Sequence, residues 1–162
     1  LTKGQASPTA LQGYKTTVQT DGSHNIPFNP VATALTLGAG FVARAFSGDM
    51  QQLKAIMKAA IEFEGYALVD IFQPCVTFNK VNTFAWYKER VRPVGEDYDP
   101  TDFDAAMQAA TQFSDEDGIP TGILYNVPKP TFKAQNKVMN RGLLKDQGAS
   151  REFLEGQLKQ FA

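Results

Sequence analysis

The segment from residue 29 to residue 72 alternates helix signals with short apolar runs, and this alternation constrains the fold more than any other feature. An Asn-Pro pair opens a predicted helix over 30–37, since asparagine caps a helix and proline fits its first turn. Strand candidates follow over 41–46 and 66–72. Between them lies a predicted helix from Met50, whose apolar residues recur at spacings of three and four. The segment therefore reads as helix, strand, helix, strand.

Short connections between such elements favour parallel strands joined by crossover helices. The run ALVDIF at 67–72 is almost continuously apolar, as is typical of a strand that is covered on both faces. The chain is 43% apolar and 20% charged, which allows a packed core. We therefore predict an α/β fold: half of a doubly wound, mostly parallel sheet with a C-terminal extension.

The segments on either side of this pattern carry weaker signals. Residues 1–28 are rich in Gly, Ser, Thr and Pro, and we predict a long loop there. Further helices are expected over 82–90, with Asn82 as the cap, and from Asp99 to about residue 113. A proline within 119–125 predicts an edge strand, because proline cannot donate to a neighbouring strand.

The expected organisation has three segments: 1–74, 75–133 and 134–162. The last is predicted to be an amphipathic helical tail that docks on a partner or on its own chain. Its apolar stripe consists of Phe153, Leu154, Leu158 and Phe161. Because the chain opens on Leu1 in a loop-like stretch, we expect it to be part of a longer polypeptide.

Charge and cysteine usage narrow the class of protein. A net charge of −1 gives no electrostatic case for nucleic acid as the main partner. No apolar run approaches the roughly 18 residues that cross a bilayer, and no signal-peptide pattern opens the chain. The single cysteine, Cys75, excludes an internal disulfide and suits a reducing cytoplasm, which is the expected location.

Two places are candidates for chemistry. A loop with glycine, a hydroxyl and the ammonium of Lys3, within residues 1–9, is able to hold a phosphate or carboxylate, although a solvated turn is the alternative. Cys75 follows the carboxyl end of a predicted parallel strand, where open α/β sheets place their sites. Its alternative role is that of a small buried apolar residue. The one histidine, His24, is interpreted as a solvated loop residue.

Taken together, these stretches resemble the beta subunits of 2-oxoacid:ferredoxin oxidoreductases, the thiamine-diphosphate enzymes that act on 2-oxoglutarate, pyruvate and related acids. The resemblance corresponds to the carboxyl-terminal half of such a subunit. The matching blocks are LTKGQASPT (1–9), PFNPVATALTLGAGFVARAFSGD (27–49), ALVDIFQPCVTFN (67–79) and WYKERV (86–91).

The resemblance implies three cofactors, each held only in part by this chain: thiamine diphosphate, Mg²⁺ and a [4Fe–4S] cluster. It places Leu1 and Thr2 at the cofactor diphosphate, Lys3 at the anionic substrate, and Cys75 as one ligand of the cluster. The family's Gly-Asp-Gly magnesium motif and its other cluster cysteines do not occur in these 162 residues. Iron–sulfur clusters need about four thiolate ligands, so this chain cannot complete the site alone.

The implied activity is the oxidative decarboxylation of a 2-oxoacid with coenzyme A, which yields acyl-CoA and carbon dioxide and reduces ferredoxin. The implied partners are the alpha subunit of the same enzyme, ferredoxin, the 2-oxoacid and coenzyme A. Two alternatives stay open: a non-catalytic assembly or docking module for a partner subunit, and a flavodoxin-like nucleotide binder that is suggested by fold alone.

Overall fold

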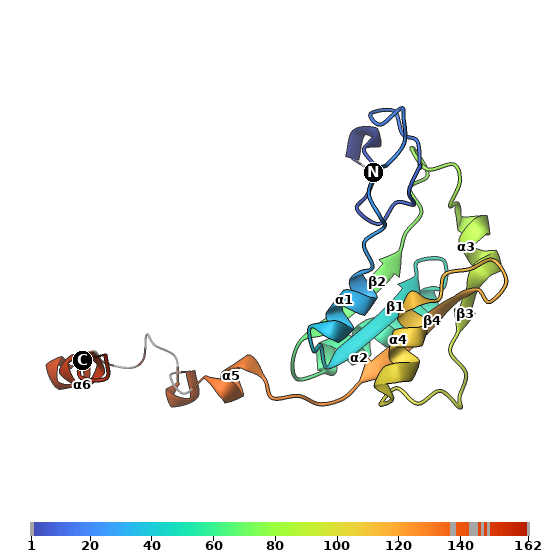
Figure 1. The fold of residues 1–162 in the computed structure, drawn as a ribbon. Coiled ribbons are helices and arrows are strands. Elements are labelled where there is room, and N and C mark those ends of the chain that lie inside the picture. The colour runs from blue at the N-terminus through green and yellow to red at the C-terminus, as the bar shows by residue number, and fades with distance from the viewer. Residues whose placement is uncertain (1, 137–138, 143–145, 147, 149, 162) are drawn as a thin grey trace. The chain divides into compact units, whose positions relative to one another are not determined.

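The computed structural model describes residues 2–136, 139–142, 146, 148 and 150–161. Its internal contacts divide the chain into two units, residues 1–129 and residues 130–162. The first unit contains the sheet and the long amino-terminal loop. Figure 1 shows the elements of both units.

The predicted helix–strand alternation is present in the first unit. Strand β1 (Phe41–Phe46) leads into helix α2 (Met50–Glu62), and α2 leads into strand β2 (Ala67–Phe72). The two strands pair in parallel and in register along their whole length. The carboxylate of Asp49 accepts from the backbone N–H of Gln52 and caps α2, which begins at the predicted Met50.

The sheet has four strands in the order β2-β1-β4-β3. Strand β4 (Ile119–Asn126) runs antiparallel to β1, and the short strand β3 (Val91–Pro93) runs parallel to β4. Two of the three pairings are therefore parallel. The predicted α/β class and the mostly parallel half-sheet are confirmed.

The prediction of an edge strand over 119–125 was wrong, because β4 lies inside the sheet between β1 and β3. The proline that suggested an edge is Pro120, near the start of the strand. Pairing with β1 involves only residues from Gly122 to Asn126, so the missing N–H of Pro120 removes no hydrogen bond to β1. A proline is therefore tolerated in an internal strand here.

Helices cover both faces of the sheet, as a doubly wound arrangement requires. Helices α1 (Pro30–Thr36) and α4 (Phe103–Thr111) pack on the face that carries Val42, and α2 packs on the opposite face through Ile56. The first core contains Val31, Ala34, Leu35, Val42, Ala106, Ala109, Ala110 and Leu124. The second contains Phe41, Ala43, Ala45 and Ile56. Successive residues of β1 thus alternate between the two cores.

Two helices begin slightly later than the predicted starts. Helix α3 (Phe84–Arg90) is capped by the hydroxyl of Thr83 rather than by Asn82, whose own N–H belongs to the preceding turn. Helix α4 is capped by the carboxylate of Asp102, three residues into the segment that was predicted to form it.

The described part of the second unit contains α5 (Phe132–Gln135), the 3₁₀ turn η2 (Met139–Arg141) and α6 (Arg151–Leu158). The apolar side chains of the predicted stripe are exposed: Phe153, Leu154, Leu158 and Phe161. Docking of this tail stays a prediction, as does the division at residues 74 and 133. In the part of the chain that the structure describes, no helix has the length and apolar character to span a membrane.

Candidate functional site

Cys75 lies in a tight turn that follows β2 directly after Pro74. The turn is closed by the backbone N–H of Asn79, which donates to the carbonyl of Cys75 at 2.9 Å. The sulfur receives backbone N–H groups of the same turn, that of Phe78 above all, and they lower the pKa of the half-buried thiol although burial opposes them. Cysteine binds metals as a thiolate, so the turn favours the form that a ligand needs.

The Thr-Lys-Gly sequence of the other candidate forms a short 3₁₀ turn, η1 (Thr2–Gly4). Lys3 has a left-handed backbone with φ 49° and ψ 31°, and no other non-glycine residue of the described chain has a positive φ. Such a conformation persists when the surroundings fix it, and it is common at functional sites. The Lys3 side chain is exposed. Leu1 lies outside the described residues.

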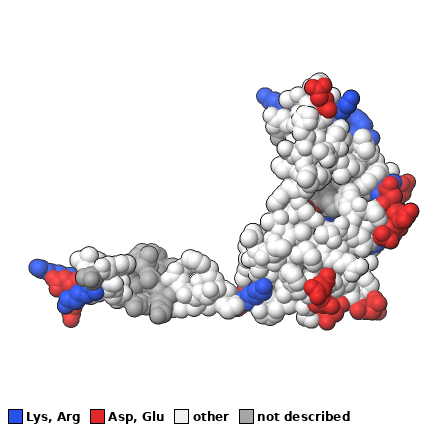
Figure 2. Space-filling view, viewed as in Figure 1, with Lys and Arg blue, Asp and Glu red and all other residues white. Residues whose placement is uncertain are grey.

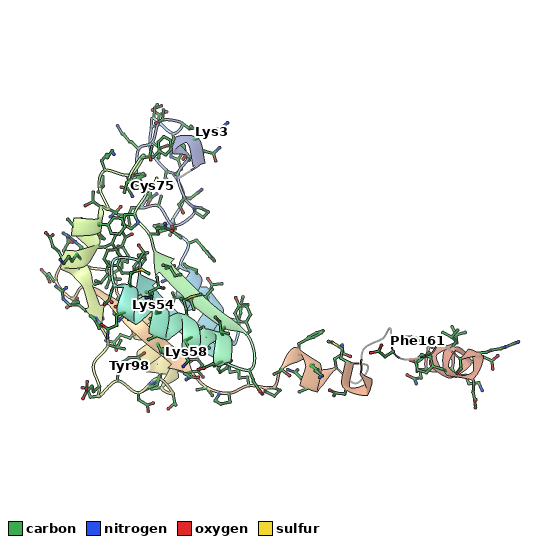
Figure 3. The ribbon with its side chains drawn as sticks, turned by 180° about the vertical axis from the view of Figure 1, so that it is seen from behind. Lys3, Lys54, Lys58, Cys75, Tyr98 and Phe161 are labelled. Carbon is green, nitrogen blue, oxygen red and sulfur yellow. The ribbon has the colours of Figure 1, made fainter. Side chains whose placement is uncertain are left out.

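The structure brings these two candidate segments together, although they are more than 70 residues apart in the sequence. Gly4 is buried, and a Cβ at this position would lie 3.0 Å from the hydroxyl of Thr17 and 3.7 Å from the ring carbon Cδ1 of Phe78. Phe78 belongs to the turn of Cys75. Lys3 and Cys75 accordingly lie at the same end of the first unit, whereas Lys54 and Lys58 mark helix α2 farther along it (Figure 3).

A cavity of about 390 Å³ lies beside the Cys75 turn, between the amino-terminal loop and the carboxyl end of the parallel strands β1 and β2. Figure 2 shows the surface hollowed between the loop and the sheet. The position is the one at which open α/β sheets bind their ligands. Its polar lining includes Ser7, Thr9, Tyr14, Arg44, Asp70, Asn79 and Tyr87.

A buried ion pair forms part of the wall of this cavity, and sequence reasoning missed it. Arg44 Nε lies 3.5 Å from Asp70 Oδ2, across the pairing of β1 with β2. The guanidinium also donates to the carbonyls of Ala109 and Ala110 at the end of α4, at 3.2 and 3.0 Å. The signal was available: an arginine and an aspartate stand at corresponding positions of two strand candidates that were expected to pair.

Burial dominates the electrostatics of this wall. It raises the pKa of Asp70, although the charge of Arg44 acts in the opposite direction. Burial likewise lowers the pKa of Arg44 against the attraction of Asp70. The pKa of Tyr87 is raised by burial and by the nearby carboxylate of Asp70. The desolvation of each charged group thus outweighs the attraction between them.

Within the described chain, no group of three or more His, Cys, Asp or Glu side chains could hold a metal ion. The chemistry of Cys75 fits one thiolate ligand of a cluster, and the other ligands of such a cluster would have to lie outside the described residues. His24 is exposed in the loop, as predicted. Its backbone carbonyl accepts from the side-chain amide of Gln12 at 3.4 Å.

Comparison with known families assigns the Lys3 turn and the Cys75 turn to two consecutive family domains. A family model described as the C-terminal TPP binding domain of thiamine pyrophosphate enzymes matches residues 1–71. A second, described as the C terminal of the pyruvate ferredoxin oxidoreductase beta subunit, matches residues 75–141. The fold, the site at the strand ends and the first match define a domain of the thiamine-diphosphate-dependent enzymes.

Individual relatives indicate which of these thiamine-diphosphate-dependent enzymes the chain is similar to. A 2-oxoacid:ferredoxin oxidoreductase beta subunit from a Sulfolobus species is 36% identical over 165 residues, which cover 96% of this chain and 54% of the relative. The corresponding subunit of Saccharolobus solfataricus is 41% identical over 134 residues, 77% of this chain and 44% of its own. The chain therefore spans about half the length of the relatives it matches.

A solved structure agrees with these relatives. The 2-oxoglutarate:ferredoxin oxidoreductase from Magnetococcus marinus, which contains 2-oxoglutarate, coenzyme A and succinyl-CoA, matches with a TM-score of 0.82 and 37% identity over 97% of this chain and 53% of its own. The chain belongs to the family of 2-oxoacid:ferredoxin oxidoreductase beta subunits. The flavodoxin-like alternative rested on fold alone and gains no support. The roles of Leu1, Thr2, Lys3 and Cys75 stay predictions.

Proposed function

We propose that this chain works as part of an enzyme that oxidatively decarboxylates a 2-oxoacid with coenzyme A. The products are acyl-CoA, carbon dioxide and reduced ferredoxin. The observation that carries this proposal is that the two candidate segments lie close together: the turn of Lys3 and the turn of Cys75 are neighbours at Gly4 and Phe78. Family membership supports the same reaction, because the relatives carry the name of this enzyme.

Lys3 is proposed to bind the carboxylate of the 2-oxoacid. An ammonium group is a compact positive charge that suits an anionic substrate, and the Lys3 side chain is exposed on a turn whose backbone is fixed. Leu1 and Thr2, at the start of the same segment, are proposed to line the diphosphate of the thiamine cofactor. When bound, this cofactor supplies the nucleophilic carbon and the electron sink for decarboxylation.

Cys75 is proposed to supply one thiolate to a [4Fe–4S] cluster that passes electrons singly to ferredoxin. The N–H groups that face its sulfur stabilise negative charge there. The other cluster ligands and the ligands of Mg²⁺ are proposed to lie outside this chain, as is the alpha subunit that completes the enzyme. The reducing cytoplasm, in which a lone cysteine stays unpaired, is the proposed location.

The proposed function is tested by Cys75→Ser in the complete enzyme. We expect the variant to lose iron and to stop reducing ferredoxin, because a serine hydroxyl is a poor ligand for a cluster iron. Thr77→Ala is the matched control, since Thr77 lies exposed in the same turn and the change keeps its backbone N–H. Full iron content and normal ferredoxin reduction in Cys75→Ser would exclude the cluster assignment.

A second function, assembly without catalysis, is favoured by the exposed apolar side chains of the second unit, among them Leu154 and Phe161. Metal analysis of the complete protein separates the two functions. A brown protein that contains iron is expected for the oxidoreductase, and a colourless one for the assembly module.

A further inference from the structure

Phe78 is the residue through which the two candidate segments contact one another. Its backbone N–H is the leading influence that lowers the pKa of the Cys75 thiol. Its ring carbon Cδ1 lies 3.7 Å from the place that a Cβ of Gly4 would occupy. Phe78 therefore belongs to the turn of Cys75 through its main chain and lies beside the Thr-Lys-Gly turn with its side chain.

Both ends of this connection are held in place. On the cysteine side, the side chain of Asn79 accepts from the backbone N–H groups of Val81 and Asn82, each at 2.9 Å, and so orders the chain just after Phe78. On the other side, Gly4 has φ 78° and lies closer to Thr17 than to Phe78, so the turn is enclosed from two directions. The Phe78 ring and Thr17 therefore lie on either hand of the turn that carries Lys3.

We propose that Phe78 is a positioning residue, which holds the Thr-Lys-Gly turn in its left-handed conformation and thereby directs Lys3 toward the 2-oxoacid. The inference rests on the proposed function, in which Lys3 binds the substrate. Phe78 itself touches neither substrate nor cofactor in this role. It ties the geometry of substrate binding to the turn of Cys75, so the two sites share one side chain.

The kinetic test uses Phe78→Ala in the complete enzyme, with Phe84→Ala as the matched control. Phe84 has almost the same exposure, 43% against 44%, and packs on Phe46 away from Gly4. We expect Phe78→Ala to raise the KM for 2-oxoglutarate about tenfold and to leave the KM for coenzyme A within about twofold, a change that corresponds to one lost charge-assisted contact. Phe78→Leu should restore most of the loss, because its side chain still fills the contact.

A second measurement follows the turn without catalysis. Hydrogen–deuterium exchange of the peptide that contains Lys3 and Gly4 is expected to be several times faster in Phe78→Ala than in Phe84→Ala. Iron content is measured on the same preparations. Exchange and the KM for 2-oxoglutarate that both match the control would overturn the proposal, as would a loss of iron with an unchanged KM. If Phe78→Ala does not fold, Phe78→Leu and Phe78→Met provide the graded series.

A double-mutant cycle separates this proposal from the proposed function. If Phe78 acts through Lys3, the variant that combines Phe78→Ala with Lys3→Ala has the KM of Lys3→Ala alone. If the two effects multiply, Phe78 acts elsewhere and the positioning role is wrong. If Lys3→Ala itself leaves the KM unchanged, the substrate role of Lys3 fails first, and this inference fails with it.

Discussion

The apolar pattern of the strands does not predict a buried arginine, yet β1 contains one. Arg44 is 3% exposed in the middle of β1, yet it interrupts neither the strand nor the core. Its guanidinium forms an ion pair with Asp70, donates to two carbonyls at the end of α4 and lies over the ring of Phe72, 5.5 Å from the centroid. One charged side chain thus joins β1, β2 and α4 at the wall of the cavity.

Removing this charge should destabilise the protein. Arg44→Met keeps the apolar stem but leaves the partly buried Asp70 without its counter-charge, a change that costs roughly 3 kcal/mol of unfolding free energy, the lower end of the range for buried pairs. Urea denaturation of the complete protein measures it. Arg151→Met is the control, because Arg151 is 93% exposed in its own ion pair and should change stability by no more than about 0.5 kcal/mol. Equal midpoints for both variants would contradict the argument.

The cost of Arg44→Met should also depend on pH. Burial raises the pKa of Asp70 in the folded state. The contribution of Asp70 to stability is therefore lost as the pH rises from its pKa in the unfolded chain, near 4, through its raised pKa in the folded protein. Without Arg44 nothing offsets that burial, and the fall should be larger. The difference between wild type and variant is therefore expected to shrink on acidification, when Asp70 is neutral. Denaturation curves across the acidic range test this, and a difference that stays constant would argue against it.

Replacing Lys3 tests its proposed role in binding the substrate. Lys3→Ala is expected to raise the KM for the 2-oxoacid at least tenfold, and that for coenzyme A much less, since one charge-assisted contact with a carboxylate is lost. Lys15→Ala controls for charge, because Lys15 is an exposed lysine of the same loop. Steady-state kinetics of the complete enzyme decide between a binding residue and a solvated one.

At the scale of elements, the strands and helices with a clear period were predictable, and the remaining ones were not. The helix–strand–helix–strand pattern over 29–72 was predicted nearly to the residue, because capping residues and apolar runs mark its ends. Strand β3 is only three residues long and carries no pattern of its own. The internal position of β4 depends on pairing with β1, a distant segment that local signals do not reveal.

The same limit applies to the site. Cys75 and Lys3 were recognisable as candidates from their motifs, but the contact of Gly4 with Phe78 was not, because it joins two loops far apart in sequence. Nothing in either loop has a period that predicts its partner. The ion pair of Arg44 with Asp70 was predictable in part. The pairing of the two strands was expected, but the opposite charges at matching positions were overlooked.

Gly122 in β4 leads to a prediction about the stability of the sheet. Gly122 has φ 132°, and a Cβ there would lie 2.7 Å from Val94 Cγ2, so Gly122→Ala should destabilise the sheet by more than about 1 kcal/mol. Gly156→Ala is the opposite control, since Gly156 is open to solvent inside α6 and alanine favours helix by up to about 1 kcal/mol. Unfolding curves and helical circular dichroism measure the two. Equal effects would contradict the packing argument.

At the scale of the whole molecule, strand β2 forms an open edge of the sheet. Every residue of β1 is buried, whereas none of β2 is, and β2 has no partner on its outer side among the described strands. An open edge with apolar side chains invites association with another strand. The outer edge of β2 is therefore free to associate with another strand when residues 1–162 stand alone.

Residues 1–162 expressed alone should therefore be poorly soluble or molten, and should show no saturable binding of thiamine diphosphate with Mg²⁺. The segment that is proposed to line the diphosphate is a single turn of three residues, Thr2–Gly4, which is too short to hold a diphosphate by itself. Calorimetric titration of the purified chain measures the binding, and calorimetric unfolding measures its order. Tight binding together with a sharp unfolding transition would show that the cofactor site is complete within this chain.

The internal place of β4 has a consequence for how the protein is made. Synthesis runs from the amino terminus, so β1 and β2 leave the ribosome long before residues 119–126, which lie between β1 and β3 in the finished sheet. Until then helix α1 alone covers the face of Val42, because Leu124 and helix α4 are still to come. Such distant pairing is slow and exposes apolar surface to aggregation. Chaperones that hold unfinished chains are expected to engage this protein during that interval.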